Sequence, residues 1–233
     1  MKVIVTGATK GIGAATLKAF LAIGADVAIN ARNESDLEAL QIACKKEYPN
    51  QEVLIKVTDM SKKDAVLEFA TFVKKQWGQI DVLVNNAGVF LPGEITKEAD
   101  GTLESQIETN LDSAYHLTRA ILPVMTPQKS GHIFNLCSIA SFMAYPNGGS
   151  YSISKFALLG FTKVLRAELL ESGIKVSAIM PGATWSASWD GVDLPKERLM
   201  AAEDIANAIV GAYQLGPSAV VEEIILRPQQ GDL

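Results

Sequence analysis

The stretch KVIVTGATKGIG, residues 2–13, leads from a short β-branched apolar segment directly into three closely spaced glycines. Continuous apolar runs of this length are typical of strands buried on both faces of a parallel sheet. Glycines after such a strand let the backbone approach a pyrophosphate, and the N-terminus of a following helix offers N–H groups to the same anion. The stretch therefore predicts a strand, a turn and a helix that bind a dinucleotide, although its spacing is GxxxGxG and not GxGxxG.

Six further apolar runs alternate with longer segments of helical periodicity along the 233 residues. They are DVAINA (26–31), EVLIKVT (52–58), DVLVNNA (81–87), HIFNLCS (132–138), KVSAIMP (175–181) and VVEEIIL (220–226). Strands that alternate with helices through right-handed crossovers form a doubly wound α/β sheet. We therefore expect a single Rossmann-like domain over residues 1–233, with a parallel sheet of about seven strands flanked by helices.

The predicted helices have recognisable ends. Ser35 and Ser61, each followed one turn later by an acidic residue, are typical of N-terminal capping boxes. Gly78 and Gly173 stand where C-terminal caps belong. In the helix expected after Ser61, the residues that fall on one apolar face are Val66, Ala70, Val73 and Trp77.

The composition argues against several classes of protein. A net charge of −5 without a clustered basic face disfavours a nucleic-acid partner. No segment is long and apolar enough to cross a bilayer, and the early glycines interrupt the apolar core that a signal peptide needs, so no membrane partner is expected. Cys44 and Cys137 form neither a disulfide framework nor a zinc pattern. We expect no metal site and a cytoplasmic location.

Turn-forming and polar residues follow the predicted strands at their carboxyl ends, where open α/β sheets bind ligands. The residues at these positions are Gly7, Ala31-Arg32, Asp59, Asn85-Asn86-Ala87-Gly88, Ser138 and Pro181-Gly182. Each residue alone is explained by the needs of a turn. Together they outline a ligand site along one rim of the sheet.

The end of the second predicted strand indicates which dinucleotide binds. A carboxylate usually holds the ribose 2′-hydroxyl of NAD there, but this chain has Ala31 followed by Arg32. Arg32, together with Lys10 inside the glycine turn, would attract a 2′-phosphate. The residues therefore favour NADP(H) over NAD(H), and the alternative is that both cations are simply solvated.

Essentially the whole chain resembles the short-chain dehydrogenase/reductase family. The matching pieces are TGxxxGxG (Thr6 to Gly13), Asp59, NNAG (Asn85 to Gly88), Asn110, Ser138, the YxxxK pair Tyr151 and Lys155, and Pro181-Gly182. A YxxxK alone occurs by chance in many helices, whereas the ordered set is highly specific. The resemblance implies an NADP-dependent oxidoreductase with the catalytic residues Asn110, Ser138, Tyr151 and Lys155.

The resemblance also implies a role for each matching residue. Asp59 would meet the adenine ring, Asn86 would lie near the adenosine ribose, Lys155 would hold the nicotinamide ribose, and Asn110 would position a water in a proton relay. Ser186 stands where the family commonly has a threonine, with Thr184 as the neighbouring candidate. The residues expected to contact the cofactor are Gly7, Thr9, Lys10, Gly11, Ile12, Gly13, Ala31, Arg32, Asn33, Asp59, Met60, Asn86, Ala87, Gly88, Tyr151, Lys155, Pro181, Gly182, Thr184 and Ser186.

Tyr151 and Lys155 lie on the same face of a predicted helix, so both can project into the rim. A tyrosine needs a pKa shift of about 3 units, or about 4 kcal/mol, to reach the neutral range. An ammonium about 4 Å away would supply that much at an effective dielectric constant of about 20. The hypothesis is that NADPH delivers hydride to a ketone, Ser138 donates a hydrogen bond to its oxygen, and Tyr151 supplies the proton as general acid.

The substrate is expected to be a small carbonyl compound that contacts Ser138, Tyr145, Tyr151, Trp185 and Trp189. The two tryptophans could instead cover the core. The tail VVEEIILRPQQGDL (220–233) and the tryptophan-bearing loop resemble those of bacterial sepiapterin reductase-like members of the family, which implies reduction of a pterin side-chain ketone. The alternatives are a reductase of 3-oxoacyl thioesters on acyl carrier protein and a non-catalytic NADP-binding regulator.

The resemblance further implies a homodimer or homotetramer that associates through the helices after the fourth and fifth predicted strands. The apolar segment FALLGFTKVLRAELL, residues 156–170, would suit such an interface. Burial inside the monomer explains the same segment equally well.

Overall fold

Seven strands form one sheet in the part of the chain that the computed structural model describes, which is residues 1–185, 195 and 198–232. The strands are β1 (Lys2–Val5), β2 (Asp26–Ala31), β3 (Val53–Val57), β4 (Val82–Asn85), β5 (Gly131–Leu136), β6 (Ile174–Pro181) and β7 (Glu223–Leu226). Their order is β3-β2-β1-β4-β5-β6-β7, and every neighbouring pair is parallel. The predicted doubly wound α/β fold is confirmed.

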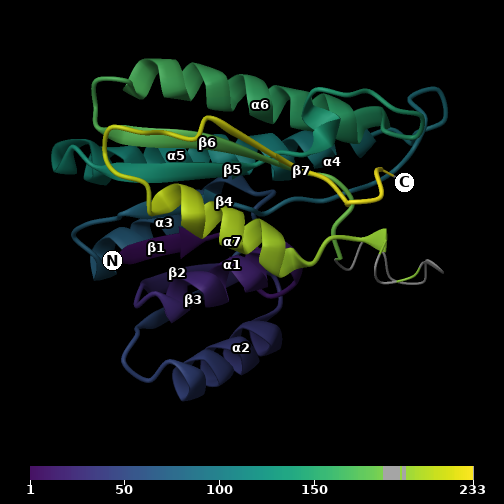
Figure 1. The fold of residues 1–233 in the computed structure, drawn as a ribbon. Coiled ribbons are helices and arrows are strands. Elements are labelled where there is room, and N and C mark those ends of the chain that lie inside the picture. Colours follow the sequence, from purple (N-terminus) through teal and green to yellow (C-terminus); the bar gives the residue numbers. More distant parts are fainter. Residues whose placement is uncertain (186–194, 196–197, 233) are drawn as a thin grey trace.

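Helices cover both faces of this sheet (Figure 1). One face packs against α1 (Gly11–Ala22), α2 (Glu34–Glu47) and α7 (Ala202–Tyr213). The other packs against α3 (Lys63–Gln76), α5 (Ser113–Met125) and α6 (Gly149–Leu169). α4 (Thr102–Ile107) continues through a π-helical turn (Glu108–Asp112) into α5, and short 3-10 turns at Thr126–Gln128 and Ile139–Ser141 flank β5.

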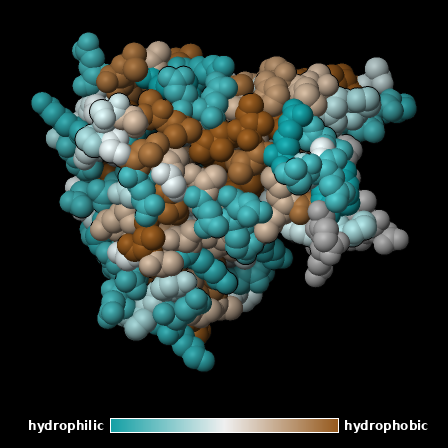
Figure 2. All heavy atoms as spheres, viewed as in Figure 1, coloured by the Kyte–Doolittle hydropathy of each residue, from teal (hydrophilic) through white to brown (hydrophobic). Residues whose placement is uncertain are grey.

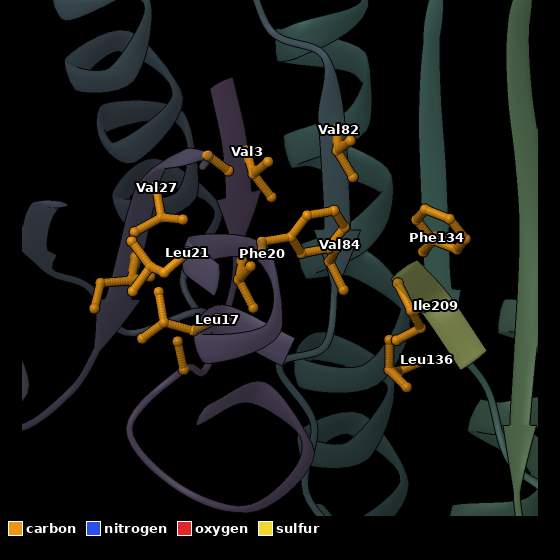
Figure 3. Close-up of a cluster of buried hydrophobic side chains, with 14 of the residues drawn as sticks. Val3, Leu17, Phe20, Leu21, Val27, Val82, Val84, Phe134, Leu136 and Ile209 are labelled. Carbon is orange, nitrogen blue, oxygen red and sulfur yellow. The ribbon is translucent and has the colours of Figure 1, made fainter. Parts of the chain in front are cut away.

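Side chains alternate along each strand and so build two separate cores. Val3 and Val5 belong to the core beneath α1 and α7, whereas Ile4 belongs to the core beneath α3 and α5. Figure 3 shows the first core, in which Phe20 of α1 and Ile209 of α7 lie against the strands. Complete burial of such side chains stabilises the fold by about 1.5–3 kcal/mol each. The predicted apolar face of α3 is also confirmed, because Val66, Ala70, Val73 and Trp77 are all buried.

Two predicted helix starts are wrong. Asn33, and not Ser35, caps α2, because its side-chain oxygen accepts a hydrogen bond from the N–H of Asp36 at 3.2 Å. Ser35 donates its hydroxyl to the same oxygen. α3 begins after Lys62, because the hydroxyl of Ser61 donates to Asp59 at 2.9 Å instead of capping the helix. Asparagine and serine cap helices about equally well, so the sequence did not distinguish them.

The sheet order places the functional site. β1 and β4 are neighbours, although β2 and β3 lie between them in the sequence. The crossover connections therefore leave in opposite directions at this point, and a crevice opens between the carboxyl ends of the two strands. The glycine turn after β1 and the segment Asn85 to Gly88 after β4 meet in this crevice.

Candidate active site

The glycine turn after β1 forms the first wall of the site. Gly7 has a φ of +64° and Gly11 a φ of +53°, both in the left-handed region. A Cβ atom at Gly13 would lie less than 3.0 Å from Nδ2 of Asn86 and from the carbonyl oxygen of Gly7, so only glycine fits there. Within the described residues, α1 has neither a side-chain cap nor an acidic residue in its first turn. Its N-terminal N–H groups therefore suit an anion such as a pyrophosphate.

Three polar side chains fix this turn against the neighbouring strands. The hydroxyl oxygen of Thr6 accepts hydrogen bonds from the N–H groups of Asn86 (3.0 Å) and Ala87 (2.9 Å). The Asn86 amide donates to the carbonyl oxygens of Thr6 (2.8 Å) and Gly7 (3.1 Å). From β2, Asn30 accepts from the N–H of Gly7 at 2.9 Å. The sequence analysis missed Asn30, although a polar residue inside the apolar run DVAINA was a signal.

Charged residues lie at the ends of β2 and β3. Arg32 and Lys10 are exposed, as a role in holding a phosphate requires. Asp59 accepts hydrogen bonds from the N–H and hydroxyl of Ser61 at 3.0 and 2.9 Å. Burial raises the pKa of Asp59, but these hydrogen bonds and the positive charges of Lys62 and Arg32 outweigh it, so the net shift is downward. The Asp59 carboxylate is therefore held in its ionised form on the same rim as Arg32.

The other residues expected to contact the cofactor lie along this rim. They follow the carboxyl ends of β1, β2, β3, β4 and β6 and are Thr9, Ile12, Ala31, Asn33, Met60, Ala87, Gly88, Pro181, Gly182 and Thr184. Asn33 is also the N-cap of α2, and the Met60 sulfur accepts a hydrogen bond from Asn30. Ser186 and Trp189 lie outside the described residues.

The four residues predicted to be catalytic converge from three elements. Ser138 follows β5, Tyr151 and Lys155 project from α6, and Asn110 lies in the π-helical turn. The Ser138 hydroxyl interacts with that of Tyr151 and by itself favours the phenolate. The ammonium of Lys155 is buried and donates to the carbonyl oxygen of Leu136 at 2.7 Å. It lies 5.8 Å from the centre of the Tyr151 ring.

The electrostatics of this group differ from the sequence expectation. Burial raises the pKa of Tyr151 to about 12 from its ordinary value of 10.0, and the hydrogen bond with Ser138 only partly offsets this. Burial lowers the pKa of Lys155 to about 8 from 10.5. The expectation that an ammonium about 4 Å away brings the phenol into the neutral range at an effective dielectric constant of about 20 is therefore wrong for this structure. Desolvation opposes the charged form of each group and is the largest cause of both pKa shifts.

A pair of side-chain amides holds the segment that follows β4. Asn110 accepts from the N–H of Val89 (2.7 Å) and donates to its carbonyl oxygen (3.0 Å). Gln106 is fully buried and makes the same pair of bonds with Leu91, at 3.2 and 3.3 Å. Phe90 lies between the two held residues, and its ring packs edge-on against Tyr151 with centroids 4.7 Å apart. The sequence analysis predicted Asn110 but missed Gln106.

Two partly exposed aromatic residues, Phe90 and Tyr145, lie near Tyr151. Phe90 is 38% exposed and Tyr145, which precedes α6, is 36% exposed. Burial of its ring raises the pKa of Tyr145. Trp185 is half-buried, and its backbone N–H donates to the carbonyl oxygen of Met200 at 2.9 Å. Of the residues expected to contact the substrate, Ser138 and Tyr145 both interact with Tyr151, in the first turn of α6.

The remaining site features concern metals and membranes. Among the described residues, no group of three or more His, Cys, Asp and Glu side chains is arranged to hold a metal ion. No helix in this part of the chain has the length and apolar character needed to cross a membrane.

Comparison with known proteins places this site in a family context. The family model described as short chain dehydrogenase matches residues 1–194. A sepiapterin reductase from Chlorobaculum tepidum is 33% identical, over 99% of this chain and 97% of the relative.

Two solved structures are similar over nearly the whole chain. A metagenomic short-chain oxidoreductase in complex with NADP superimposes with a TM-score of 0.85 at 31% identity, covering 98% of this chain and 97% of the other. An alcohol dehydrogenase from Thermococcus sibiricus complexed with 5-hydroxy-NADP superimposes with a TM-score of 0.90 at 27% identity, covering 98% and 96%.

Proposed function

The chain belongs to the short-chain dehydrogenase family of oxidoreductases, and we propose that it is an NADPH-dependent carbonyl reductase. The observation that carries the proposal is that the Ser138 hydroxyl interacts with Tyr151, whose ring centre lies 5.8 Å from the buried ammonium of Lys155. The Lys155 ammonium lies beside Gly88, which follows β4, and this supports a place for the group next to the crevice at which sheets of this kind bind dinucleotides.

The cofactor of this chain is NADP(H). Two structural neighbours with 27–31% identity contain NADP or a derivative of it. The chain's own residues agree, because α1 presents an uncapped N-terminus to a pyrophosphate and Arg32 stands where NAD-dependent enzymes carry an acid. When bound, the cofactor supplies the hydride that reduces the carbonyl carbon.

The residues of this chain supply the proton and orient the carbonyl group. Because the pKa of Tyr151 is raised to about 12, its phenol is protonated at neutral pH and can act as general acid. The Ser138 hydroxyl donates a hydrogen bond to the carbonyl oxygen and so stabilises the negative charge that develops there. With a pKa of about 8, Lys155 is largely an ammonium at pH 7 and offsets the charge left on the phenolate.

Replacement of Tyr151 by Phe tests this mechanism, because it keeps the ring that packs on Phe90 and removes the proton. We expect NADPH oxidation with a ketone to fall by at least 10²-fold, in line with the loss of a general acid. Binding of NADPH, followed by its fluorescence, should be unchanged. Tyr48→Phe, at the end of α2, is the matched control and should have normal turnover. Normal turnover in Tyr151→Phe would exclude the proposed role.

The proposed substrate is a planar ketone, with a pterin side-chain ketone as the leading candidate. Phe90 and Tyr145 present aromatic surface on which a flat ring could stack. A 3-oxoacyl thioester on acyl carrier protein is the alternative, but an acidic carrier protein would need a basic mouth, and Arg198 already donates to the carbonyl oxygens of Gly231 and Asp232. NADPH oxidation with sepiapterin, a 3-oxoacyl thioester and simple diketones would rank these substrates. No oxidation with any of them would favour a non-catalytic regulator.

We also propose that the protein is cytoplasmic and forms a homodimer or homotetramer. A groove between α5 and α6 is lined by Tyr115, Phe161 and Val164, and Val164 is 58% exposed. Figure 2 shows further apolar residues on the viewed face above α7, over the β6–β7 edge of the sheet, where Ile225 is 53% exposed. Light scattering would measure the mass, and Val164→Glu should lower it if α5 and α6 form the interface.

A further inference from the structure

The carboxylate of Glu98, a residue not predicted to be catalytic, holds the start of α6, the helix that carries Tyr151 and Lys155. Glu98 lies in the segment between β4 and α4, far in sequence from α6. Its Oε1 accepts a hydrogen bond from the N–H of Ser150 at 2.9 Å. Its Oε2 accepts a short hydrogen bond from the hydroxyl of the same serine. Ser150 is buried and immediately precedes Tyr151.

The first turn of α6 needs such a partner. Helix N-termini leave N–H groups without intrahelical acceptors, and Gly148, at the N-cap position, has no side chain to provide one. An anionic acceptor is favourable at this end of the helix. Gly149 makes room for it, because a Cβ atom there would lie less than 3.0 Å from Oε1 of Glu98 and from the carbonyl oxygen of Gly93. Glu98 thus acts as the missing cap.

The segment that carries Glu98 is itself fixed. The N–H of Gly93 donates to the carbonyl oxygen of Asn147 at 3.0 Å, just before α6. Gln106 of α4 holds the backbone of Leu91 through two hydrogen bonds. Phe90, at the start of the same segment, packs against the Tyr151 ring. The segment therefore contacts both the side chain of Tyr151 and the backbone immediately before it.

We propose that Glu98 is a positioning residue for the reaction, because its carboxylate anchors the first turn of α6 and thereby sets the position of the Tyr151 hydroxyl relative to Ser138. The role rests on the proposed function of Tyr151. Without the two bonds to Ser150, the turn is free to shift, and a displacement of about 1 Å at a reacting group can cost about 10²-fold in rate.

Two substitutions separate anchoring from charge. Glu98→Ala removes both bonds, and we expect kcat for ketone reduction to fall about 10-fold. Glu98→Gln removes the charge but can keep both bonds, because its amide oxygen accepts from the Ser150 N–H and its amide nitrogen donates to the serine hydroxyl. This variant should recover kcat to within about twofold of native. Glu94→Gln is the matched control. In the part of the chain that the structure describes, the Glu94 carboxylate pairs with exposed Lys97, so this variant should leave kcat unchanged.

The readouts distinguish positioning from a merely structural role. The concentration of folded sites is determined by NADPH titration, and kcat is expressed per site. A positioning role lowers kcat per site in Glu98→Ala while the dissociation constant of NADPH stays within about twofold, because Tyr151 is displaced and the glycine turn is not. A structural role lowers the melting temperature and the number of sites but leaves kcat per site at the native value, and that result would overturn the proposal.

Should Glu98→Ala fail to fold, Glu98→Asp provides the second test. It keeps the charge but is too short by one methylene to reach Ser150, so kcat per site should again fall about 10-fold. A folded Glu98→Asp protein with native kcat would refute the proposal. The proposed function can fail separately: it fails if Tyr151→Phe is active, whereas only the role of Glu98 fails if Tyr151→Phe is inactive and Glu98→Ala has native kcat.

Discussion

Acidification from pH 7 to pH 5 should destabilise this protein through His132, a buried histidine on β5. Its Nε2 lies 2.7 Å from the hydroxyl of Ser177, and that hydroxyl donates to the carbonyl oxygen of Val221. The serine must therefore accept, so Nε2 carries the imidazole proton. Nδ1 is buried and has no hydrogen-bond partner among the described residues. Protonation of Nδ1 would create a buried, charged N–H donor that has no acceptor among the described residues.

The size of the effect follows from the shift in pKa. Burial lowers the pKa of His132 to about 3 from its ordinary value of 6.5, with a smaller contribution from the positive charge of Lys175. Below pH 6.5 His132 binds a proton in the unfolded chain, whereas in the folded chain it does so only near pH 3. The free energy of unfolding therefore falls as the pH falls from 6.5 to about 3. Each pH unit below 6.5 lowers the free energy of unfolding by about 1.4 kcal/mol, so the loss is about 2 kcal/mol at pH 5.

Urea unfolding at pH 7, 6 and 5 would measure this loss in the native protein and in His132→Gln. Glutamine does not titrate, and its amide can still donate to Ser177. The variant should lose about 2 kcal/mol less than the native protein between pH 7 and pH 5. His116→Gln, on α5, is the control and should follow the native curve. Carboxylates whose pKa is lowered, such as Asp26 with an ordinary value of 3.8, titrate below pH 5 and so do not contribute between pH 7 and pH 5. Equal losses in His132→Gln and the native protein would refute the reasoning.

The remaining predictions concern the cofactor and the catalytic lysine. Gly13→Ala forces a Cβ into Asn86 and the Gly7 carbonyl, so we expect at least 10-fold weaker binding of NADPH and a lower melting temperature. Gly160 is a helical glycine with open space around it, so Gly160→Ala should instead stabilise the fold by about 0.5–1 kcal/mol. Arg32→Asp places a carboxylate at the end of β2 and should raise the KM for NADPH at least 10-fold while lowering that for NADH, as measured by steady-state kinetics; unchanged preference would remove Arg32 from the phosphate site. Because burial lowers the pKa of Lys155 to about 8, kcat/KM for NADPH, which reports the free enzyme, should decline as the pH rises above about 8, and a flat profile to pH 10 would contradict a need for the ammonium.

The fold was predictable because its signals are local. Each strand lies within a short and largely apolar run, so the order of the strands could be predicted from the sequence. The positions of Gly7 and Gly13 were predictable for the same reason. Helix starts were not, because Asn33 and Ser35 are about equally good caps by residue type.

The supporting residues of the site were not predictable because their partners are distant in the sequence. Asn30 acts on Gly7, Gln106 on Leu91, and Glu98 on Ser150. Each is a polar side chain that binds backbone groups or a hydroxyl on another element. Asn30 at least interrupts an apolar run, whereas no periodicity marks Gln106 or Glu98. The pKa of Tyr151 was misjudged for a related reason, since desolvation depends on the packed surroundings and not on the spacing to Lys155.

The position of Tyr151 is determined by several backbone anchors and not by its own hydrogen bond alone. Glu98 holds the residue before it, and the hydroxyl of Ser154 donates to its carbonyl oxygen while accepting from Asn110. Lys155 fixes the following turn to β5 through Leu136. These anchors come from the segment after β4, the π-helical turn and β5, and each fixes a different part of the first turns of α6. A half-buried tyrosine with a raised pKa can then donate its proton from a fixed place, which is the arrangement that general acid catalysis requires.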